Sequence, residues 1–149
     1  MGVMYAQGRG VSQDEAKAVA WWRKAAGQGY VSAQYNLGNM YARGTGVRQE
    51  NSKAAEWYSK AAEQGHAEAQ YYFGVMYALG QGVSQDAAKA VEWFRKAAEQ
   101  GNADAQHGLG AMYEEGRGVA QNNAKAVEWF LKAAQQGHKK AQKTLRELE

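Results

Sequence analysis

The sequence lacks cysteine and proline altogether, and each absence limits how the chain can fold. Without cysteine, neither disulfide bonds nor thiolate metal sites can hold the fold, and the redox compartment and cellular localisation stay open. Without proline, the 18 glycines must interrupt the helices and form the turns. No segment approaches the roughly 20 consecutive apolar residues of a membrane-spanning helix, so we expect no membrane insertion.

A large excess of charge of one sign is also missing. The 149 residues carry a formal net charge of +3, with 45% hydrophobic and 22% charged side chains, which is the balance of a folded globular domain. The Lys and Arg residues are spaced at regular intervals and do not form a block. A small, dispersed charge of this kind does not indicate nucleic-acid binding.

A 36-residue period runs through the whole sequence. Of the 28 columns from Gly2 to Gly29, 15 hold the same residue in all four copies. The period indicates a single repeat domain over residues 1–149. Its expected parts are a truncated repeat at 1–30, full repeats at 31–66, 67–102 and 103–138, and a C-terminal capping helix at 139–149.

Each repeat is predicted to form two helices. In the second copy, apolar residues recur with helical spacing over residues 31–43 and again over about 51–64. A helix pair this short cannot bury its apolar face alone, so neighbouring pairs must stack. The predicted fold is therefore all-α, a right-handed superhelical solenoid of stacked antiparallel helix pairs.

The second helix of each repeat carries a tryptophan and a pair of opposite charges. The tryptophan column is predicted to form a ladder in the core: Trp21, Trp57, Trp93 and Trp129. Glu56 precedes Lys60 by four residues, an order that favours a helical ion pair, and the same spacing recurs in the next two copies.

Glycines and polar residues mark the helix ends. Gly44 and Gly65 are predicted to end the two helices of a repeat, whereas Gly38 lies inside a helix. Because an internal glycine destabilises a helix, we expect a neighbouring helix or a bulky ring to pack against the backbone at Gly38. One polar residue in each copy lies where it could cap the second helix: Asp14, Glu50, Asp86 and Asn122.

The repeat can be written A-x-A-Q-x-x-L-G-x-M-Y-x-x-G-x-G-V-x-Q-x-x-x-K-A-x-x-W-x-x-K-A-A-x-Q-G. This pattern resembles the Sel-one-like repeat family, a branch of the tetratricopeptide repeats, along the whole chain. The resemblance implies a non-catalytic adaptor or scaffold that binds peptides or protein surfaces on a concave side lined by the first helices. Some relatives carry a cysteine pair in each repeat; here packing alone must stabilise the helix pairs.

The start of the sequence departs from this pattern. Met1 aligns with Leu37, so the first helix of the first copy lacks its opening turn. We expect a fragment of a longer array, or a trimmed cap, whose exposed N-terminal end could self-associate.

Catalytic and cofactor motifs are weak. The Gly-x-Gly-Val turn lacks the preceding strand and the third glycine of a dinucleotide fingerprint. No serine is followed three residues later by lysine, as a penicillin-binding hydrolase would require. His66 and His138 occupy one column two repeats apart, and His107 lies in another, so no metal site is predicted. We expect no enzyme activity and no cofactor.

The candidate binding residues are those that vary on the outward face of the first helix while the surrounding columns repeat. They are Tyr35, Asn39, Arg43, Tyr71, Val75, Leu79, His107, Ala111, Glu114 and Glu115. Tyr71 and Leu79 are the predicted apolar anchors for an extended peptide or a partner helix, and the charged ends would set its orientation.

Other functions remain open at this stage. The chain could be a purely structural segment of a longer scaffold, in which each repeat contacts only its neighbours. A repeat that reads RNA is less favoured, because Val75, Leu79, Glu114 and Glu115 suit phosphate poorly. The partner itself cannot be read from the sequence.

Overall fold

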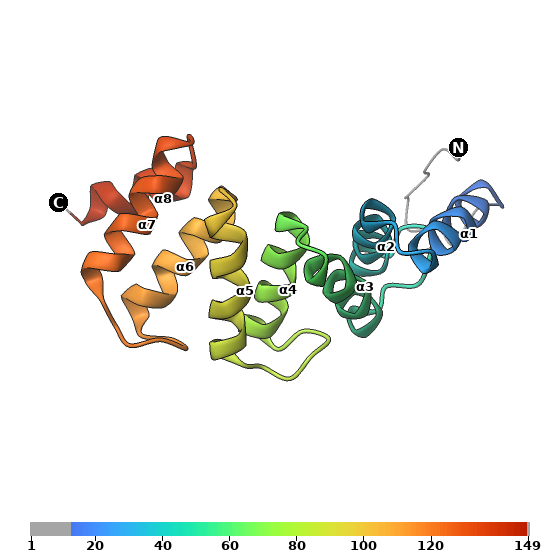
Figure 1. The fold of residues 1–149 in the computed structure, drawn as a ribbon, viewed down its shortest axis with the longest axis horizontal. Helices are drawn as coiled ribbons and strands as arrows, with labels where there is room; N and C mark the ends of the chain where they lie inside the picture. Colours follow the sequence, from blue (N-terminus) through green and yellow to red (C-terminus); the bar gives the residue numbers. More distant parts are fainter. Residues whose placement is uncertain (1–12, 149) are drawn as a thin grey trace.

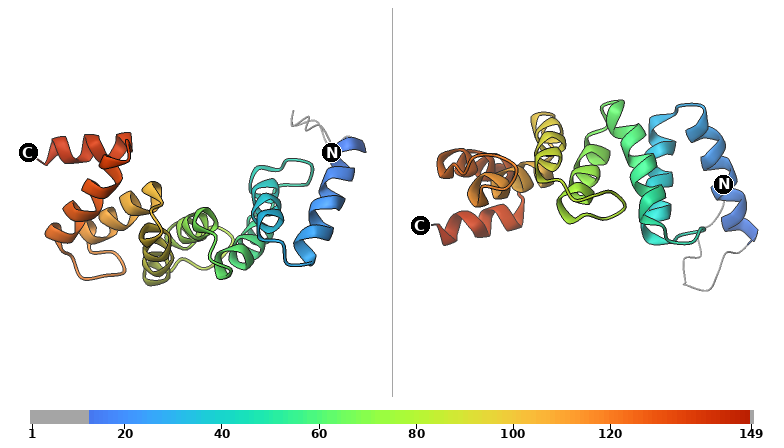
Figure 2. Two further views of the ribbon diagram at one scale, coloured as in Figure 1. Left: turned by 45° about the horizontal axis from the view of Figure 1, so that its top comes forward. Right: turned by 90° about the horizontal axis from the view of Figure 1, so that it is seen from below.

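The computed structural model describes residues 13–148, which form eight α-helices and no strand (Figure 1). The helices are α1 (Gln13–Gly27), α2 (Val31–Arg43), α3 (Asn51–Glu63), α4 (Ala67–Leu79), α5 (Ala87–Glu99), α6 (Ala103–Glu115), α7 (Asn123–Gln135) and α8 (Lys139–Glu147). Each helix packs mainly against the helices before and after it in the chain. Figures 1 and 2 show the resulting elongated array from α1 to α8. The predicted all-α right-handed solenoid with 36-residue repeats is confirmed.

The core depends on glycines that admit aromatic rings. Gly38 of α2 lies against Tyr58 of α3, and a methyl group added at Gly38 would lie 2.7 Å from the tyrosine ring. Gly74 and Phe94, of α4 and α5, repeat the contact at 2.8 Å. The expected ring contact at Gly38 is therefore confirmed.

The tryptophan column does not form the buried ladder that the sequence predicts. Trp57 is only half-buried and Trp21 is 68% exposed, whereas the next residue in the second repeat, Tyr58, is 4% exposed. One residue along a helix turns the side chain by about 100°. The residue after each tryptophan therefore points into the stack, and the tryptophan lies at its margin.

The predicted Glu–Lys ion pairs are also absent among the described residues, where the one close contact between a basic and an acidic side chain joins His138 Nε2 to Asp104 Oδ1. The lysine ammonium instead lies over the preceding tryptophan ring: Lys60 is 5.8 Å from the centroid of Trp57, and Lys132 is 4.8 Å from that of Trp129. A cation over an indole face gains about as much as an exposed ion pair. The predicted pairing of lysine with glutamate was therefore wrong, because the lysine contacts a tryptophan ring instead.

Capping agrees with the sequence at two of the predicted positions. Asp86 accepts a hydrogen bond from the Lys89 amide, and Asn122 accepts one from the Lys125 amide. Glu50 precedes α3 but makes no side-chain cap, and Asp14 lies within the first turn of α1.

The second glycine of the Gly-x-Gly-Val turn has a role at Gly82 and Gly118 that the sequence did not reveal. At Gly82, with φ of 74°, an added methyl group would lie 2.3 Å from the carbonyl oxygen of Asn51, at the start of α3. The turn after α4 therefore packs closely against the second helix of the preceding repeat. A side chain at this position would push the two repeats apart.

Pairs of glutamines, one buried and one exposed, join successive repeats. Gln70 Nε2 donates to the carbonyl oxygen of Ala62, near the end of α3, and Gln70 Oε1 accepts from Gln100 Nε2. Gln100 Nε2 also donates to the Gly65 carbonyl oxygen. The same contacts recur one repeat earlier and one repeat later, and we call them the glutamine network. Its residues are Gln34, Gln64, Gln70, Gln100, Gln106 and Gln136.

Two further expectations concern the ends of the array, a C-terminal capping helix and an N-terminal end that self-associates. α8 packs onto α7, where Ala141 is buried and Gln142 Nε2 donates to the Ala134 carbonyl oxygen. The expected N-terminal surface for self-association involves residues 1–8, which lie outside the described residues.

Candidate interaction surface between the first helices

The predicted binding residues form one stripe on each first helix. Tyr35, Asn39 and Arg43 follow one another at four-residue spacing along α2, and so share a face. Equivalent stripes lie on α4 and α6. They consist of Tyr71, Val75 and Leu79, and of His107, Ala111 and Glu115 with its neighbour Glu114.

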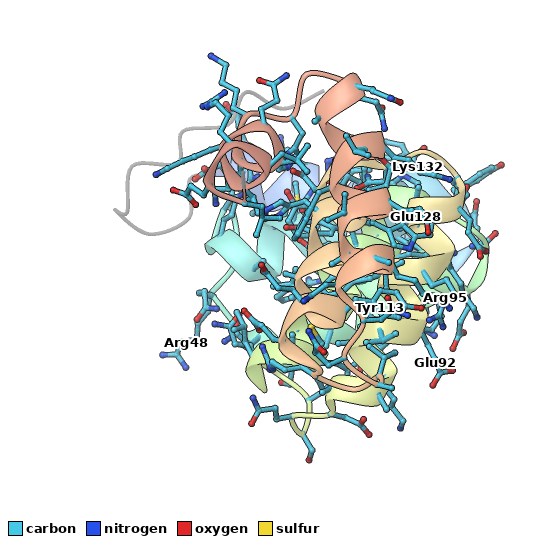
Figure 3. All side chains as sticks on the ribbon, turned by 90° about the vertical axis from the view of Figure 1, so that its left-hand side faces the viewer. Arg48, Glu92, Arg95, Tyr113, Glu128 and Lys132 are labelled. Carbon is cyan, nitrogen blue, oxygen red and sulfur yellow. The ribbon has the colours of Figure 1, made fainter. Side chains whose placement is uncertain are left out.

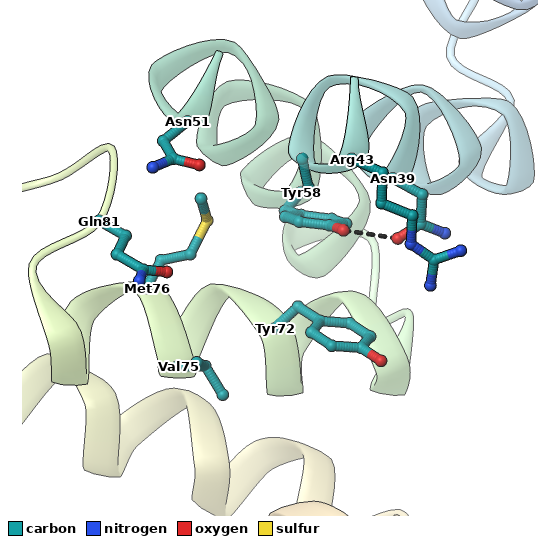
Figure 4. Close-up of a pocket in the computed structure, with 9 residues that line it drawn as sticks. Asn39, Arg43, Asn51, Tyr58, Tyr72, Val75, Met76 and Gln81 are labelled. Atoms are coloured by element: carbon teal, nitrogen blue, oxygen red, sulfur yellow. Dashed lines mark hydrogen bonds between the residues drawn. The ribbon is translucent and has the colours of Figure 1, made fainter. Parts of the chain in front are cut away.

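A pocket of about 180 Å³ opens between α2, α3 and α4 (Figure 4). It is lined by Asn39, Ala42, Arg43, Asn51, Tyr58, Tyr72, Val75, Met76 and Gln81. Three of the predicted residues, Asn39, Arg43 and Val75, therefore meet at one site. Arg43 is the only charged residue in this lining.

Tyr58 forms the polar part of the pocket wall. Its hydroxyl donates to Asn39 Oδ1 over 2.5 Å, which joins α3 to α2 (Figure 4). Burial raises the pKa of the Tyr58 phenol, with smaller contributions from Tyr35 and Tyr72, while the charge of Arg43 acts in the opposite direction. The phenol therefore stays protonated and holds the Asn39 amide in place.

Aromatic rings extend from the pocket along the stack. The Tyr35 ring stacks on His66 with centroids 4.5 Å apart, and the Tyr58 ring stacks on Tyr72 at 5.7 Å. Tyr71 contacts Tyr72 edge-on at 5.1 Å. Burial raises the pKa of Tyr35 and of Tyr71. Tyr35 and Tyr71 are half-buried and pack against the core, so they contribute to the packing of the stack as well as to the surface.

His107 lies next to His138, a contact that the sequence comparison missed. Their rings stack with centroids 4.9 Å apart, and His138 Nε2 lies 2.9 Å from Asp104 Oδ1. His138 Nδ1 accepts the Ala141 amide and so caps α8, as His66 caps α4. Burial lowers the pKa of His107, as do the charges of His138 and Lys140, while Asp104 opposes the shift. The described residues contain no cluster of three groups that could hold a metal ion.

The remaining predicted residues differ in accessibility. Leu79, the last residue of α4, is 58% exposed, and Glu115 at the end of α6 is also exposed. Ala111 and Glu114 are half-buried, and Ala111 packs against the core. Leu79 is therefore the accessible apolar residue of the set, whereas Ala111 presents little surface.

Sequence reasoning also missed residues that line the pocket. Tyr72 shares its column with Asn36, Gly108 and Thr144, so its variation could have identified it. Tyr58 gave no such signal, because its column holds an aromatic residue in every copy and indicates core packing. The pocket therefore combines variable residues of the first helices with a core ring of α3.

Comparison with known proteins identifies a repeat family and solved structures with the same architecture. The Sel1 repeat model matches residues 1–30, 31–66, 67–102 and 103–138. A solved Sel1 repeat protein from Oxalobacter formigenes is 40% identical, with a TM-score of 0.79 over 88% of this chain and 98% of its own. Helicobacter pylori cysteine rich protein B is 28% identical, with a TM-score of 0.68 over 90% of this chain and 96% of its own.

A third solved structure is a protective antigen present in uropathogenic Escherichia coli strains that displays an SLR fold. It is 47% identical with a TM-score of 0.82 over 89% of this chain, which matches only 28% of the antigen's length. No curated protein matches the chain. In the described part, no helix has the length and apolar character needed to cross a membrane.

Proposed function

The chain belongs to the Sel1 repeat family, and from this membership we propose that it is a non-catalytic interaction module that binds a peptide or partner protein. The binding surface is the side formed by α2, α4 and α6, which we take to be concave. Sel1 repeat proteins generally serve as protein–protein interaction scaffolds. The binding residues on this chain and the class of ligand are our proposal.

The pocket between α2 and α4 is the observation that carries the proposal. It lies between two successive first helices and offers apolar walls from Val75 and Met76 beside polar groups from Asn39 and Arg43. Binding sites commonly combine an apolar cleft with a few polar groups that fix orientation. A peptide side chain seated here would leave the rest of the peptide to follow the stripes on α4 and α6.

Leu79 and the charged ends extend the surface beyond the pocket. Leu79 exposes 58% of its area and offers an apolar anchor. Arg43 at one end of the surface and Glu114 and Glu115 at the other carry opposite charges. A ligand of complementary charge would therefore bind in one direction.

Selection from a library of random peptides displayed with free C-termini, using the immobilised chain, tests the proposal. We expect enriched peptides to lose about 10-fold in affinity on Leu79→Ala, because an apolar anchor is truncated. Leu131→Ala on α7, where the leucine is 45% exposed, is the matched control and should change nothing. Val75→Trp should also weaken binding by filling the pocket, with thermal unfolding confirming that this variant folds.

The alternative is a structural segment of a longer scaffold. The glutamine network supports it, because its side chains donate to carbonyl oxygens of the preceding repeat at three successive junctions. Failure to enrich any peptide, or equal losses from Leu79→Ala and Leu131→Ala, would contradict peptide binding on this surface and favour the structural role.

A further inference from the structure

We propose that the pocket between α2 and α4 selects peptides that present a carboxylate, which the guanidinium of Arg43 binds. The proposal rests on the peptide-binding function above and specifies its ligand. The carboxylate belongs to an Asp or Glu side chain or to a peptide C-terminus, and an apolar side chain beside it occupies the pocket.

Arg43 is available for such a ligand. It is exposed at the end of α2 and lines the pocket, and it makes no hydrogen bond or ion pair within residues 13–148. Three other arginines are engaged: Arg23 and Arg95 donate to tyrosine hydroxyls, and Arg117 donates to the Ala78 carbonyl oxygen. Arg48 makes no such bond among the described residues either, but it does not line this pocket with Arg43. The five N–H donors of Arg43 are thus directed at solvent beside a formed pocket.

The charge around Arg43 favours an anion. The other polar side chains of the lining are the amides of Asn39, Asn51 and Gln81 and the phenols of Tyr58 and Tyr72, all of which are uncharged. The positive charge of Arg43 also reaches the Tyr35 and Tyr58 rings, where it opposes the effect of burial on their pKa values. A carboxylate entering the pocket would meet one cation and no carboxylate of the lining.

The shape of the site favours a carboxylate next to an apolar group. Val75 and Met76 of α4 form an apolar wall, and the stacked rings of Tyr58 and Tyr72 lie beside Arg43 (Figure 4). A volume of about 180 Å³ admits one side chain or a terminal residue, not a folded element. Arginine binds carboxylates through paired, charge-assisted hydrogen bonds, which are stronger than neutral ones. The apolar wall supplies affinity, and Arg43 supplies selectivity.

Charge-neutral ligands and matched arginine variants test this assignment. Peptides enriched by the wild-type chain are synthesised with each Asp or Glu replaced by Asn or Gln, and separately with an amidated C-terminus. Their dissociation constants are measured by fluorescence anisotropy for the wild type, for Arg43→Gln and for Arg48→Gln. Arg48 is also exposed, but it projects from the loop between α2 and α3 away from the helices (Figure 3).

One carboxylate of the peptide should account for the loss of affinity on neutralisation. We expect its neutralisation to weaken binding to the wild type about 10-fold or more, and to matter little to Arg43→Gln, since both changes remove the same interaction. The arm that loses affinity identifies a side chain or the C-terminus as its source. Arg48→Gln should bind like the wild type.

Three results would overturn the assignment. Peptides that respond to Leu79→Ala but not to Arg43→Gln would leave the proposed function standing and remove the carboxylate site. The same holds if Arg48→Gln weakens binding as much as Arg43→Gln, because the effect would then be one of general charge. If no peptide is enriched, the proposed function fails, and the carboxylate site fails with it.

Discussion

Gln100 and Gln70 are joined by their side chains: Gln100 Nε2 donates to Gln70 Oε1 over 2.8 Å. Gln70 in turn donates to the Ala62 carbonyl oxygen over 3.1 Å. Three consecutive helices, α3, α4 and α5, are therefore linked through one buried amide. The Ala62 carbonyl oxygen also accepts the Gly65 amide over 3.0 Å, so Gln70 adds a side-chain hydrogen bond to the backbone bond that ends α3.

Replacing Gln70 by leucine should lower the free energy of unfolding by about 2 kcal/mol, because two side-chain hydrogen bonds of a buried amide are lost, at about 1 kcal/mol each. Gln142→Leu is the matched control. Gln142 occupies the same column but is only half-buried, and its one side-chain hydrogen bond is to Ala134. Urea unfolding of the two variants should show the larger loss for Gln70→Leu. Equal losses would mean that the network does not stabilise the junction.

Two glycines of α6 should respond in opposite ways to alanine. At Gly110 a methyl group would lie 2.7 Å from the Phe130 ring, whereas at Gly108 it would lie 3.5 Å from the Phe94 ring, an ordinary contact. Gly110→Ala should destabilise the chain by about 1–3 kcal/mol through overpacking. Gly108→Ala should stabilise it by about 0.5–1 kcal/mol, since alanine favours the helix. Thermal unfolding midpoints measure both, and shifts of the same sign would contradict the packing argument.

A missing arginine suggests a stabilising substitution. Arg95 donates to the Tyr113 hydroxyl over 2.9 Å, and the two lie side by side in Figure 3. Ser59 holds the position of Arg95 one repeat earlier, and Tyr77 holds that of Tyr113. Ser59→Arg should recreate the bond and raise the free energy of unfolding by about 0.5–1 kcal/mol.

The Tyr77 hydroxyl provides the control for this substitution. In a Tyr77→Phe background, Ser59→Arg should give no gain, because the acceptor is gone. A gain that persists in this background would assign the stabilisation to helix propensity or general charge instead. The comparison is a double-mutant cycle measured by urea unfolding.

The sequence predicted the fold because its signals were internal to each repeat. The 36-residue period and the unfavourable glycine at Gly38 both pointed to helices packed around rings, as found. The predicted tryptophan ladder was wrong: Trp57 lies at the margin of the core and the next residue, Tyr58, fills the interior, about 100° further round the helix. Periodicity alone does not show which of two adjacent aromatic residues faces the core.

Contacts between repeats were harder to predict than contacts within them. Aligning the copies compares equal positions, but His107 meets His138, which lies 31 residues later in a different column. The Asn39–Tyr58 hydrogen bond likewise joins a variable residue to a core residue. The variable columns identified Asn39, Arg43 and Val75, whereas the pocket that gathers them depends on the crossing of α2, α3 and α4.

Stability should fall with acidification partly through His107. Burial and the neighbouring His138 and Lys140 lower the pKa of His107, despite the opposing charge of Asp104. The unfolded chain, with an ordinary histidine pKa of about 6.5, then binds the proton more readily than the folded chain. The contribution of His107 to stability is therefore complete above about pH 6.5 and is lost as pH falls from there toward the lower folded pKa. The thermal unfolding midpoint should therefore be lower at a pH of about 5.5 than at a pH of about 7.5.

His107→Tyr should reduce that drop, because tyrosine remains neutral over this range and already occupies the same column at Tyr35 and Tyr71. His66→Asn serves as the control: asparagine caps α6 at the equivalent Asn102, so the cap of α4 is kept while one titrating histidine is removed. If His107→Tyr retains the full wild-type drop, the acid sensitivity arises elsewhere. If His107→Tyr reduces the pH dependence of the unfolding midpoint and His66→Asn does not, the stacked pair of His107 and His138 is the source of the acid sensitivity. Burial in that contact and the nearby charge of Lys140 both disfavour a positive charge on His107.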